Sequence, residues 1–251
     1  MANRHAVVML SGGLDSAVCL ALACWEYAAL DAVSIYYGQR HTIELEYAEH
    51  LAQAVGARSR RVTIDPAFWK QTPLVTPPGF NGTTELFGGA DAEQPESLET
   101  GRSVYAIRDG GIPRSVVPGR NAVFLAHAVA LAQLLGGADV LFGANLDDAT
   151  GFLDCRPEFI DAFDMVARVQ SSGRVRVRAP LLFCSKRNIA WLAQQCALDP
   201  ALTWSCYRPR TTLAGAVPCG TCDACMLRAD ALNHPEPLEV GLPARKAEAI
   251  A

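Results

Sequence analysis

The chain has 251 residues, of which half are hydrophobic and 19% are charged, and its formal net charge is −4. This composition can bury the core of one large domain, and the negative charge excludes the broad basic surface of a general nucleic-acid binder. The first residues lack the layout of a signal peptide and no run of about 18 apolar residues could span a membrane, so we expect a cytoplasmic protein with no membrane partner.

The first 64 residues alternate short apolar runs with segments of helical spacing. The apolar runs 5–10, 32–37 and 58–64 predict strands, and the segments 16–30 and 42–56 between them predict helices. This βαβαβ order predicts parallel strands that are joined by right-handed crossovers.

The regular pattern stops at residues 65–119, which are rich in Gly, Pro, Thr and acidic residues. We interpret this stretch as a long irregular insertion that could act as a lid, because loops of this length are uncommon unless they are functional or disordered. Further elements are then predicted, with Ser185 as the N-cap of the last helix. They are helix 121–137, strand 138–145, helix 156–170, strand 175–182 and helix 185–198. We therefore predict an α/β domain over residues 1–200 and a separate C-terminal segment over residues 201–251.

The sequence SGGLDS, Ser11 to Ser16, lies between the first predicted strand and helix. At such a turn, successive backbone N–H groups and the helix N-terminus form an anion site, and Gly12 and Gly13 let the backbone approach a phosphate. Asp15 would suit a helix cap or a Mg²⁺ ligand. A plain glycine turn is the alternative. The chain has no GxxxxGK[ST] sequence and no GxGxxG at the first turn, which excludes a Walker A loop and disfavours a dinucleotide fold.

Four further segments lie where predicted strands give way to loops or loops open helices, the edge at which open α/β sheets bind ligands. They are YYGQRH (36–41), VPGRN (117–121), GANLDDATGFLDCRPEF (143–159) and PLLFCSK (180–186). Taken singly, their charged residues could instead be solvated loop charges or surface pairs.

Nine cysteines in a reducing compartment are not expected to form structural disulfides. We expect Cys19, Cys24, Cys184 and Cys196 to pack as small core residues, and Cys155 to be packed or to line a pocket. The remaining four cysteines suit one tetrahedral Zn²⁺ per chain. Four protein ligands leave no open position for a substrate, so the metal would be structural. A redox thiol site and an iron–sulfur cluster are the alternatives. The predicted ligands are Cys206, Cys219, Cys222 and Cys225.

SGGLDS after the first strand closely resembles the PP-loop of the ATP pyrophosphatases, and its combination with GQRH, VPGRN, DCRPEF and CGTCDAC resembles the QueC family over about residues 5–235. The resemblance implies a parallel-sheet PP-loop fold with a small zinc-binding segment. It also implies a homodimeric ATP- and Mg²⁺-dependent carbon–nitrogen ligase with no stable nucleic-acid partner. Its small-molecule substrates would be 7-carboxy-7-deazaguanine, ammonia and ATP, converted to 7-cyano-7-deazaguanine through adenylated intermediates.

The resemblance also implies residue roles. Catalytic roles fall on Ser11, Asp15, Ser16 and Lys186. The ATP site would comprise Leu10, Ser11, Gly12, Gly13, Leu14, Asp15, Ser16, Ala17, Val18, Cys19 and Leu20. Substrate binding would fall on Gln39, Arg40, His41, Arg120, Asn121, Asp154 and Arg156.

Three other functions stay open. The long stretch before VPGRN, the twelve residues between Cys206 and Cys219, and GFLDCR in place of the usual GYPDCR depart from the family pattern. They leave room for a QueC-like paralogue that uses a different amine. A tRNA thiolation enzyme of the PP-loop group would need a basic RNA surface, and a zinc-knuckle nucleic-acid binder would not need SGGLDS.

Overall fold

The structure, a computed structural model, describes residues 4–39, 42–69, 75, 117–213 and 215–238. Two predicted substrate residues, Arg40 and His41, lie outside the described residues, as does most of the predicted insertion at 65–119.

Five parallel strands form the central sheet, in the order β3-β2-β1-β4-β5. The α/β fold with a parallel sheet that the βαβαβ pattern predicts is therefore confirmed. The strands are β1 (His5–Met9), β2 (Ala29–Tyr36), β3 (Arg58–Thr63), β4 (Asp139–Leu141) and β5 (Arg176–Arg178).

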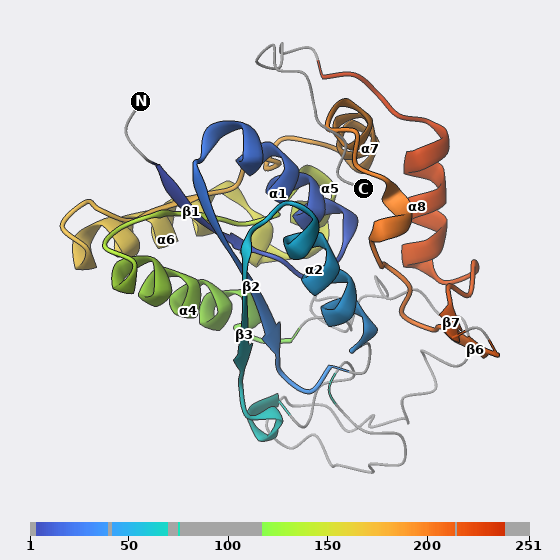
Figure 1. Cartoon of the computed structure of the whole chain (residues 1–251), viewed down its shortest axis with the longest axis horizontal. Helices are drawn as coiled ribbons and strands as arrows, with labels where there is room; N and C mark the ends of the chain where they lie inside the picture. Colours follow the sequence, from blue (N-terminus) through green and yellow to red (C-terminus); the bar gives the residue numbers. More distant parts are fainter. Residues whose placement is uncertain (1–3, 40–41, 70–74, 76–116, 214, 239–251) are drawn as a thin grey trace.

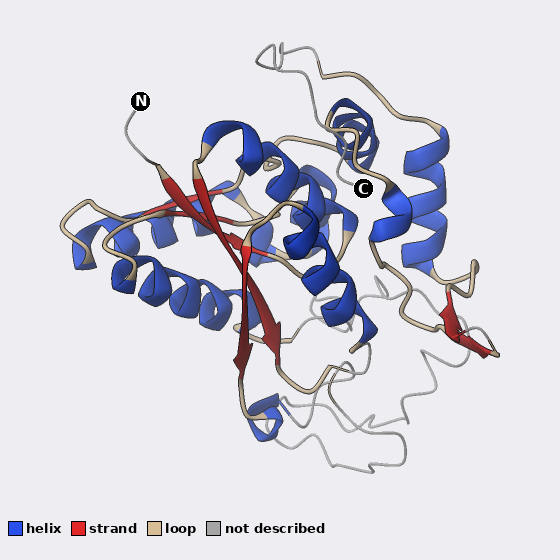
Figure 2. Cartoon of the chain, viewed as in Figure 1, coloured by secondary structure: helices blue, strands red, loops and turns tan. Residues whose placement is uncertain are grey.

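Helices cover both faces of this sheet (Figures 1 and 2). Ala6 and Val8 of β1 pack against the helices of one face, and Val7 and Met9 pack against those of the other. Since strands buried on both sides need no polar face, β1 reads as a continuous apolar run in the sequence. One face carries α1 (Leu14–Glu26), α2 (Ile43–Ala54) and α7 (Lys186–Gln195), and the other carries α4 (Arg120–Leu134) and α6 (Pro157–Gln170).

Several predicted boundaries differ from the structure. Helix α1 ends at Glu26 instead of residue 30, because Tyr27 is extended and β2 already begins at Ala29. The predicted strand 175–182 shortens to β5, and Pro180 has no N–H to continue a ladder.

Some short elements were not predicted. Helix α5 has a polar sequence, and α8 has no clear apolar stripe, so neither gives the periodic signal of a helix. The unpredicted elements are α5 (Leu146–Gly151), α8 (Asp223–Asn233), the antiparallel pair β6 (Arg210–Thr212) and β7 (Gly215–Val217), and single helical turns at Pro66–Trp69, Leu153–Cys155 and Pro200–Leu202.

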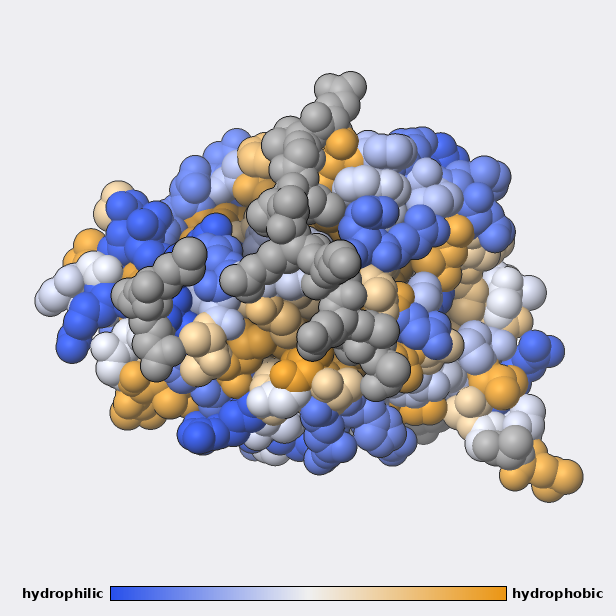
Figure 3. Space-filling model, turned by 45° about the horizontal axis from the view of Figure 1, so that its top comes forward, coloured by the Kyte–Doolittle hydropathy of each residue, from blue (hydrophilic) through white to orange (hydrophobic). Residues whose placement is uncertain are grey.

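Hydrophilic and hydrophobic residues alternate over small areas of the surface shown in Figure 3. Within the part of the chain that the structure describes, no helix is both long and apolar enough to cross a membrane.

The strand order places a topological switch point between β1 and β4. From β1 the chain continues to β2 on one side, whereas β4 is followed by β5 on the other. The loops that leave the carboxyl ends of β1 and β4 therefore diverge, which opens the crevice in which α/β sheets bind ligands.

Gly12, in the loop after β1, packs directly on the first turn of α2. Its φ is +89°, and a Cβ atom there would lie 2.1 Å from the carbonyl oxygen of Glu44. The carbonyl of Gly12 also accepts a hydrogen bond of 2.8 Å from the N–H of Trp204. Packing within the protein therefore requires glycine here, apart from any need to approach a phosphate.

We predict that Gly12→Ala lowers the free energy of unfolding by at least about 2 kcal/mol, because it combines a strained φ with a backbone clash. Gly13→Ala is the matched control, since φ is −78° at Gly13 and its nearest Cβ contact would be 3.4 Å from Ser11 Oγ. Urea unfolding of the two variants measures the difference. Equal stabilities would contradict this account of Gly12.

Candidate active site

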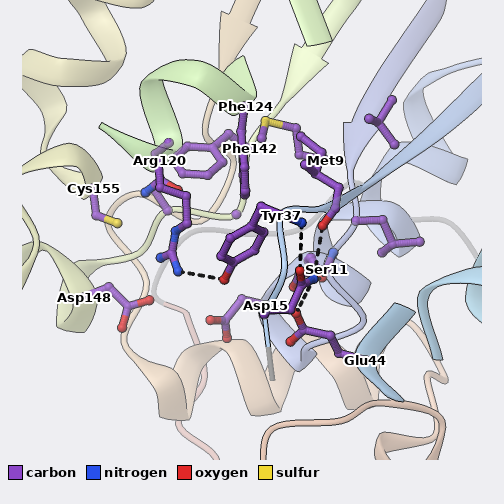
Figure 4. A pocket seen from close by; sticks show the side chains of 18 of the residues that line it. Met9, Ser11, Asp15, Tyr37, Glu44, Arg120, Phe124, Phe142, Asp148 and Cys155 are labelled. Carbon is purple, nitrogen blue, oxygen red and sulfur yellow. Dashed lines mark hydrogen bonds between the residues drawn. The ribbon is translucent and has the colours of Figure 1, made fainter. Parts of the chain in front are cut away.

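Two adjoining cavities, of about 320 and 250 Å³, lie at the carboxyl ends of β1 and β4. We name the first the apolar chamber, because its lining includes Val33 and Ile35 as well as Met9, Phe124 and Phe142. Figure 4 shows the last three. The second is the C-terminal chamber. The two chambers form one continuous site because nine residues line both: Ser11, Asp15, Glu44, Arg120, Asn121, Asp148, Phe152, Cys155 and Tyr207.

The C-terminal chamber joins the loop after β1 to the end of the chain. Gly13 and Leu14 line it from the loop, and Lys186 lines it from the start of α7. The rest of its lining comes from the segment before α8 and from α8 itself: Trp204, Ser205, Ala224, Leu227, Arg228 and Ala231.

The SGGLDS loop is tied by its own hydroxyl groups. Ser16 Oγ donates to the carbonyl of Gly13 at 2.9 Å and accepts from the N–H of Ser11 at 3.2 Å, while Gly13 N donates to Ser11 Oγ at 3.3 Å. Helix α1 has Gly13 as its N-cap and no side-chain cap, so its first-turn N–H groups keep the capacity to bind an anion. Asp15 does not cap this helix, contrary to one of the two sequence-based interpretations.

Asp15 instead belongs to an ion cluster with Lys186 and Asp148. Lys186 Nζ lies 2.6 Å from Asp15 Oδ2 and 3.0 Å from Asp148 Oδ2, and Asn145 donates to both carboxylates at 3.2 and 2.7 Å. Burial alone would lower the pKa of Lys186, but the two carboxylates raise it above its ordinary value. Two carboxylates against one ammonium leave a net negative charge, and their oxygens are the ligands that Mg²⁺ prefers.

Lys186 is held in this position by the start of its own helix. Ser185 is the N-cap of α7, as predicted, and forms a capping box with Asn188. The backbone N–H of Lys186 also donates to Asp147 at 2.7 Å. The interpretation of Lys186 as a solvated surface residue is therefore wrong.

Arg120 is a half-buried cation without a carboxylate at ion-pair distance among the described residues. Its Nη1 donates to the hydroxyl of Tyr37 at 3.2 Å, and both side chains point into the apolar chamber (Figure 4). Burial acts to lower the pKa of Arg120, but its interaction with Tyr37 and, less strongly, with Asp154 keeps this pKa above its ordinary value. A guanidinium that stays charged in a cavity is suited to bind an anionic group of a ligand.

Glu44, which the sequence analysis did not select, lines both chambers from the first turn of α2. It accepts one described side-chain hydrogen bond, from Gln39 Nε2 at 3.2 Å. Burial raises the pKa of Glu44 from its ordinary value of 4.5 to about 7, although Gln39 and Arg120 oppose the shift. Glu44 can therefore exchange a proton near neutral pH.

The other predicted site residues take different places. Gln39 lines the apolar chamber, but its amide is bound by Tyr37 N and Ile35 O as well as by Glu44. Arg156 is exposed, donates to the carbonyl of Ala149 and lines neither chamber. Asp154 lines neither chamber but lies close to Arg120 and Asn121.

The predicted ATP-binding segment has two parts, one up to Ser16 that borders the chambers and one after Ser16 that is buried in the core. Leu10, Ser11, Gly13, Leu14, Asp15 and Ser16 line one or both chambers. The next four residues line neither chamber and belong to the hydrophobic core, at most 1% exposed: Ala17, Val18, Cys19 and Leu20.

Four cysteines meet beside the C-terminal chamber. The sulfurs of Cys206, Cys219, Cys222 and Cys225 all lie within 4.8 Å of one another. Cys206 Sγ accepts backbone N–H groups of Arg208 and Cys219, and Cys219 Sγ accepts those of Thr221 and Cys222. Such N–H groups stabilise sulfurs in their thiolate form, in which cysteines bind metals.

Cys155 is buried and lines both chambers. Of the two interpretations, a packed residue or a pocket residue, the structure agrees with the pocket residue. Burial raises the pKa of its thiol to about 12, so it is not an activated nucleophile.

The sequence model of the queuosine biosynthesis protein QueC matches residues 5–79 and 82–236. A relative from Syntrophotalea carbinolica, named 7-cyano-7-deazaguanine synthase, is 38% identical over 90% of this chain and 90% of its own length. A protein of the same name from Rhodopirellula baltica is 39% identical over 89% and 85%. Among solved structures, NMN synthetase from Francisella tularensis aligns with a TM-score of 0.45 and 17% identity over 80% of this chain and 64% of that one.

We predict that Glu44→Gln raises the melting temperature at high pH. The folded protein holds the Glu44 proton more tightly than the unfolded chain, so the associated stability is present below pH 4.5 and is lost as the pH rises through about 7. Glutamine mimics the neutral acid, so the variant should match the wild type near pH 4.5 and exceed it by about 1–3 kcal/mol above pH 7.

Thermal unfolding across this pH range tests the prediction. Glu46→Gln, on the exposed side of the same helical turn, is the control and should leave the pH dependence unchanged. A constant difference between Glu44→Gln and the wild type at every pH would show that Glu44 is not a buried acid.

Proposed function

The chain belongs to the QueC family, and from this premise we propose that it converts 7-carboxy-7-deazaguanine, ammonia and ATP into 7-cyano-7-deazaguanine through adenylated intermediates. It is an ATP-dependent enzyme of queuosine biosynthesis, as its relatives are. The observation that carries the proposal is the junction of two chambers at the SGGLDS loop. A reaction that joins an acid to the α-phosphate of ATP needs two ligands that meet at a phosphate site.

The first half of the reaction makes the carboxylate reactive. A carboxylate oxygen of the substrate attacks the α-phosphorus of ATP, and the bond to pyrophosphate breaks. Ammonia then attacks the carboxyl carbon, a proton leaves the nitrogen, and AMP departs with the attacking oxygen to leave an amide. The amide oxygen then attacks the α-phosphorus of a second ATP and pyrophosphate leaves again. Loss of AMP and of the remaining N–H protons gives the nitrile.

The described residues have separate parts in this scheme. The apolar chamber suits the adenine base, because its lining is mainly aliphatic and aromatic. The N–H groups of the loop and the hydroxyls of Ser11 and Ser16 would stabilise the charge on the departing pyrophosphate. Arg120 and Asn121, at the junction of the chambers, would hold the substrate carboxylate.

Glu44 also lies at this junction, where nitrogen must lose protons in both halves of the reaction. A carboxylate that titrates near pH 7 is suited to accept them. Its partner Gln39 would position it, since the amide of Gln39 is held by the carbonyl of Ile35 in β2 and by the N–H of Tyr37 just after the strand.

Mg²⁺ would be held by Asp15 and Asp148, whose carboxylates already converge on one cation, the ammonium of Lys186. When bound, the ion would neutralise phosphate charge. Lys186 itself would stay charged throughout and keep the two carboxylates in place.

The four cysteines would hold one structural Zn²⁺. Tetrahedral zinc with Zn–S bonds of about 2.3 Å places its sulfurs about 3.8 Å apart, which fits sulfurs that lie within 4.8 Å of one another. A [4Fe–4S] cluster binds each cysteine to a different iron and spreads the sulfurs farther apart, so it fits this arrangement less well. The homodimer, the cytoplasmic location and ammonia as the natural amine stay predictions.

We predict that exchange of labelled pyrophosphate into ATP requires 7-carboxy-7-deazaguanine, and that nitrile formation rises with ammonium chloride and rises further at higher pH, where more NH₃ is present. Glutamine alone should give no product. Mass spectrometry of the products measures both steps. Adenylation without amide or nitrile at any ammonium concentration would favour the paralogue that uses another amine, and no acid-dependent exchange would reject the synthase.

We predict about one Zn²⁺ per purified chain, and that Cys222→Ser yields less folded protein with little metal, because the cluster orders the C-terminal segment. Cys24→Ser is the control, since Cys24 is half-buried in α1 and lies outside the cluster. Elemental analysis and circular dichroism measure the two effects. A folded, fully active Cys222→Ser protein without zinc would contradict a structural role.

A further inference from the structure

Arg228, in the second turn of α8, lines the C-terminal chamber together with Ser11, Gly13 and Leu14 of the SGGLDS loop. Its Nη1 donates to Thr203 Oγ1 at 2.7 Å and to Ser205 Oγ at 3.2 Å, and its Nη2 donates to the carbonyl of Pro200. All three acceptors are uncharged. Among the described residues, no carboxylate lies at ion-pair distance from this guanidinium.

The guanidinium keeps one edge free for a ligand. Nη1 has two acceptors and Nη2 has one, so Nε–H and the second N–H of Nη2 have no acceptor among the described residues. Nε of Arg228 is not among the buried side-chain nitrogens that lack a hydrogen-bond partner in the described residues, so this N–H is open to solvent. Two parallel N–H groups on one edge match two oxygens of a phosphate.

A polyphosphate in the C-terminal chamber would need positive charge from the protein. Lys186 is already bound by Asp15 and Asp148, so it adds no net positive charge for a polyphosphate. Of the cations that line the chamber, Arg120 and Arg228 have no carboxylate partner within the described ranges. Burial lowers the pKa of Arg228, because the charged guanidinium is less stable away from water. An anion bound beside it would offset this loss of hydration.

We propose that Arg228 binds the pyrophosphate that leaves in each adenylation step, together with the backbone N–H groups of the SGGLDS loop, which lines the same chamber. The proposal rests on the ATP-splitting part of the proposed function. The loop contributes N–H groups and the helix N-terminus, and Arg228 contributes a full positive charge. Arg120, at the junction with the apolar chamber, remains the partner for the substrate carboxylate.

This role links the four cysteines to the ATP site. Cys222 is the N-cap of α8 and Cys225 lies in its first turn, while Arg228 follows three residues later on the same side of the helix. A metal at the cysteines would therefore fix the start of α8 and, through it, the position of the guanidinium.

Binding of pyrophosphate to the zinc-loaded full-length protein, measured by calorimetry with Mg²⁺ present and without acid or ammonia, tests the proposal. Arg228→Gln should weaken binding by roughly 10- to 100-fold, the effect of losing a charge-assisted pair of hydrogen bonds, and Arg228→Lys should weaken it less. Arg187→Gln is the matched control. Arg187 also contacts α8, through Asp230 at 3.0 Å, but lines neither chamber, so its loss should leave pyrophosphate affinity unchanged.

Three results would overturn the proposal. Unchanged pyrophosphate affinity in Arg228→Gln would remove the contact. A raised KM for the acid with unchanged pyrophosphate affinity would assign Arg228 to the carboxylate. If both Arg228 variants lost zinc and the helical signal in circular dichroism, Arg228 would be needed for folding of the C-terminal segment and not for pyrophosphate binding. If the wild type binds pyrophosphate through Arg228 but forms no nitrile, the proposed function fails while this assignment stands.

Discussion

The contact between Gly12 and the first turn of α2 is the constraint on which the site depends. With φ at +89° and no room for a Cβ atom, Gly12 brings the SGGLDS loop against the backbone of Glu44. Its carbonyl binds the N–H of Trp204, which brings in the segment that leads to the cysteines. One residue without a side chain thus joins the loop, α2 and the C-terminal segment, and both chambers are bounded by these three parts.

The charges of the site are arranged for ligands rather than for stability. Asp15 and Asp148 share one ammonium, Glu44 is half-buried with a raised pKa, and Arg120 and Arg228 have no carboxylate partner in the part of the chain that the structure describes. Each arrangement costs stability in the free protein because burial disfavours an unpaired charge. ATP, a divalent cation and an acidic substrate would supply partners for these charges.

The C-terminal segment makes a second contribution to the site besides its cysteines. Helix α8 is tied to α7 by Arg187 and Asp230, and to the residues before it by Arg228. Its inner side lines the C-terminal chamber, as Ala224, Leu227 and Ala231 show. The crevice of the candidate site is therefore closed on this side by a segment that the sequence analysis treated as a separate unit.

The sequence alone determined the order of the strands and helices, the loop at Ser11–Ser16 and the four cysteines, because these depend on periodicity and on spacing within short segments. It also located Ser185 as a cap and selected Arg120, which lines both chambers. It did not reveal Glu44 or Arg228, or helices α5 and α8, which carry little periodic signal. Only the tertiary structure decided the sheet order and the cluster in which Lys186 reaches Asp15 across 171 residues of sequence. The physical reason is that an ion pair or a shared cavity depends on which elements pack together, and that packing is set by long-range burial of apolar surface.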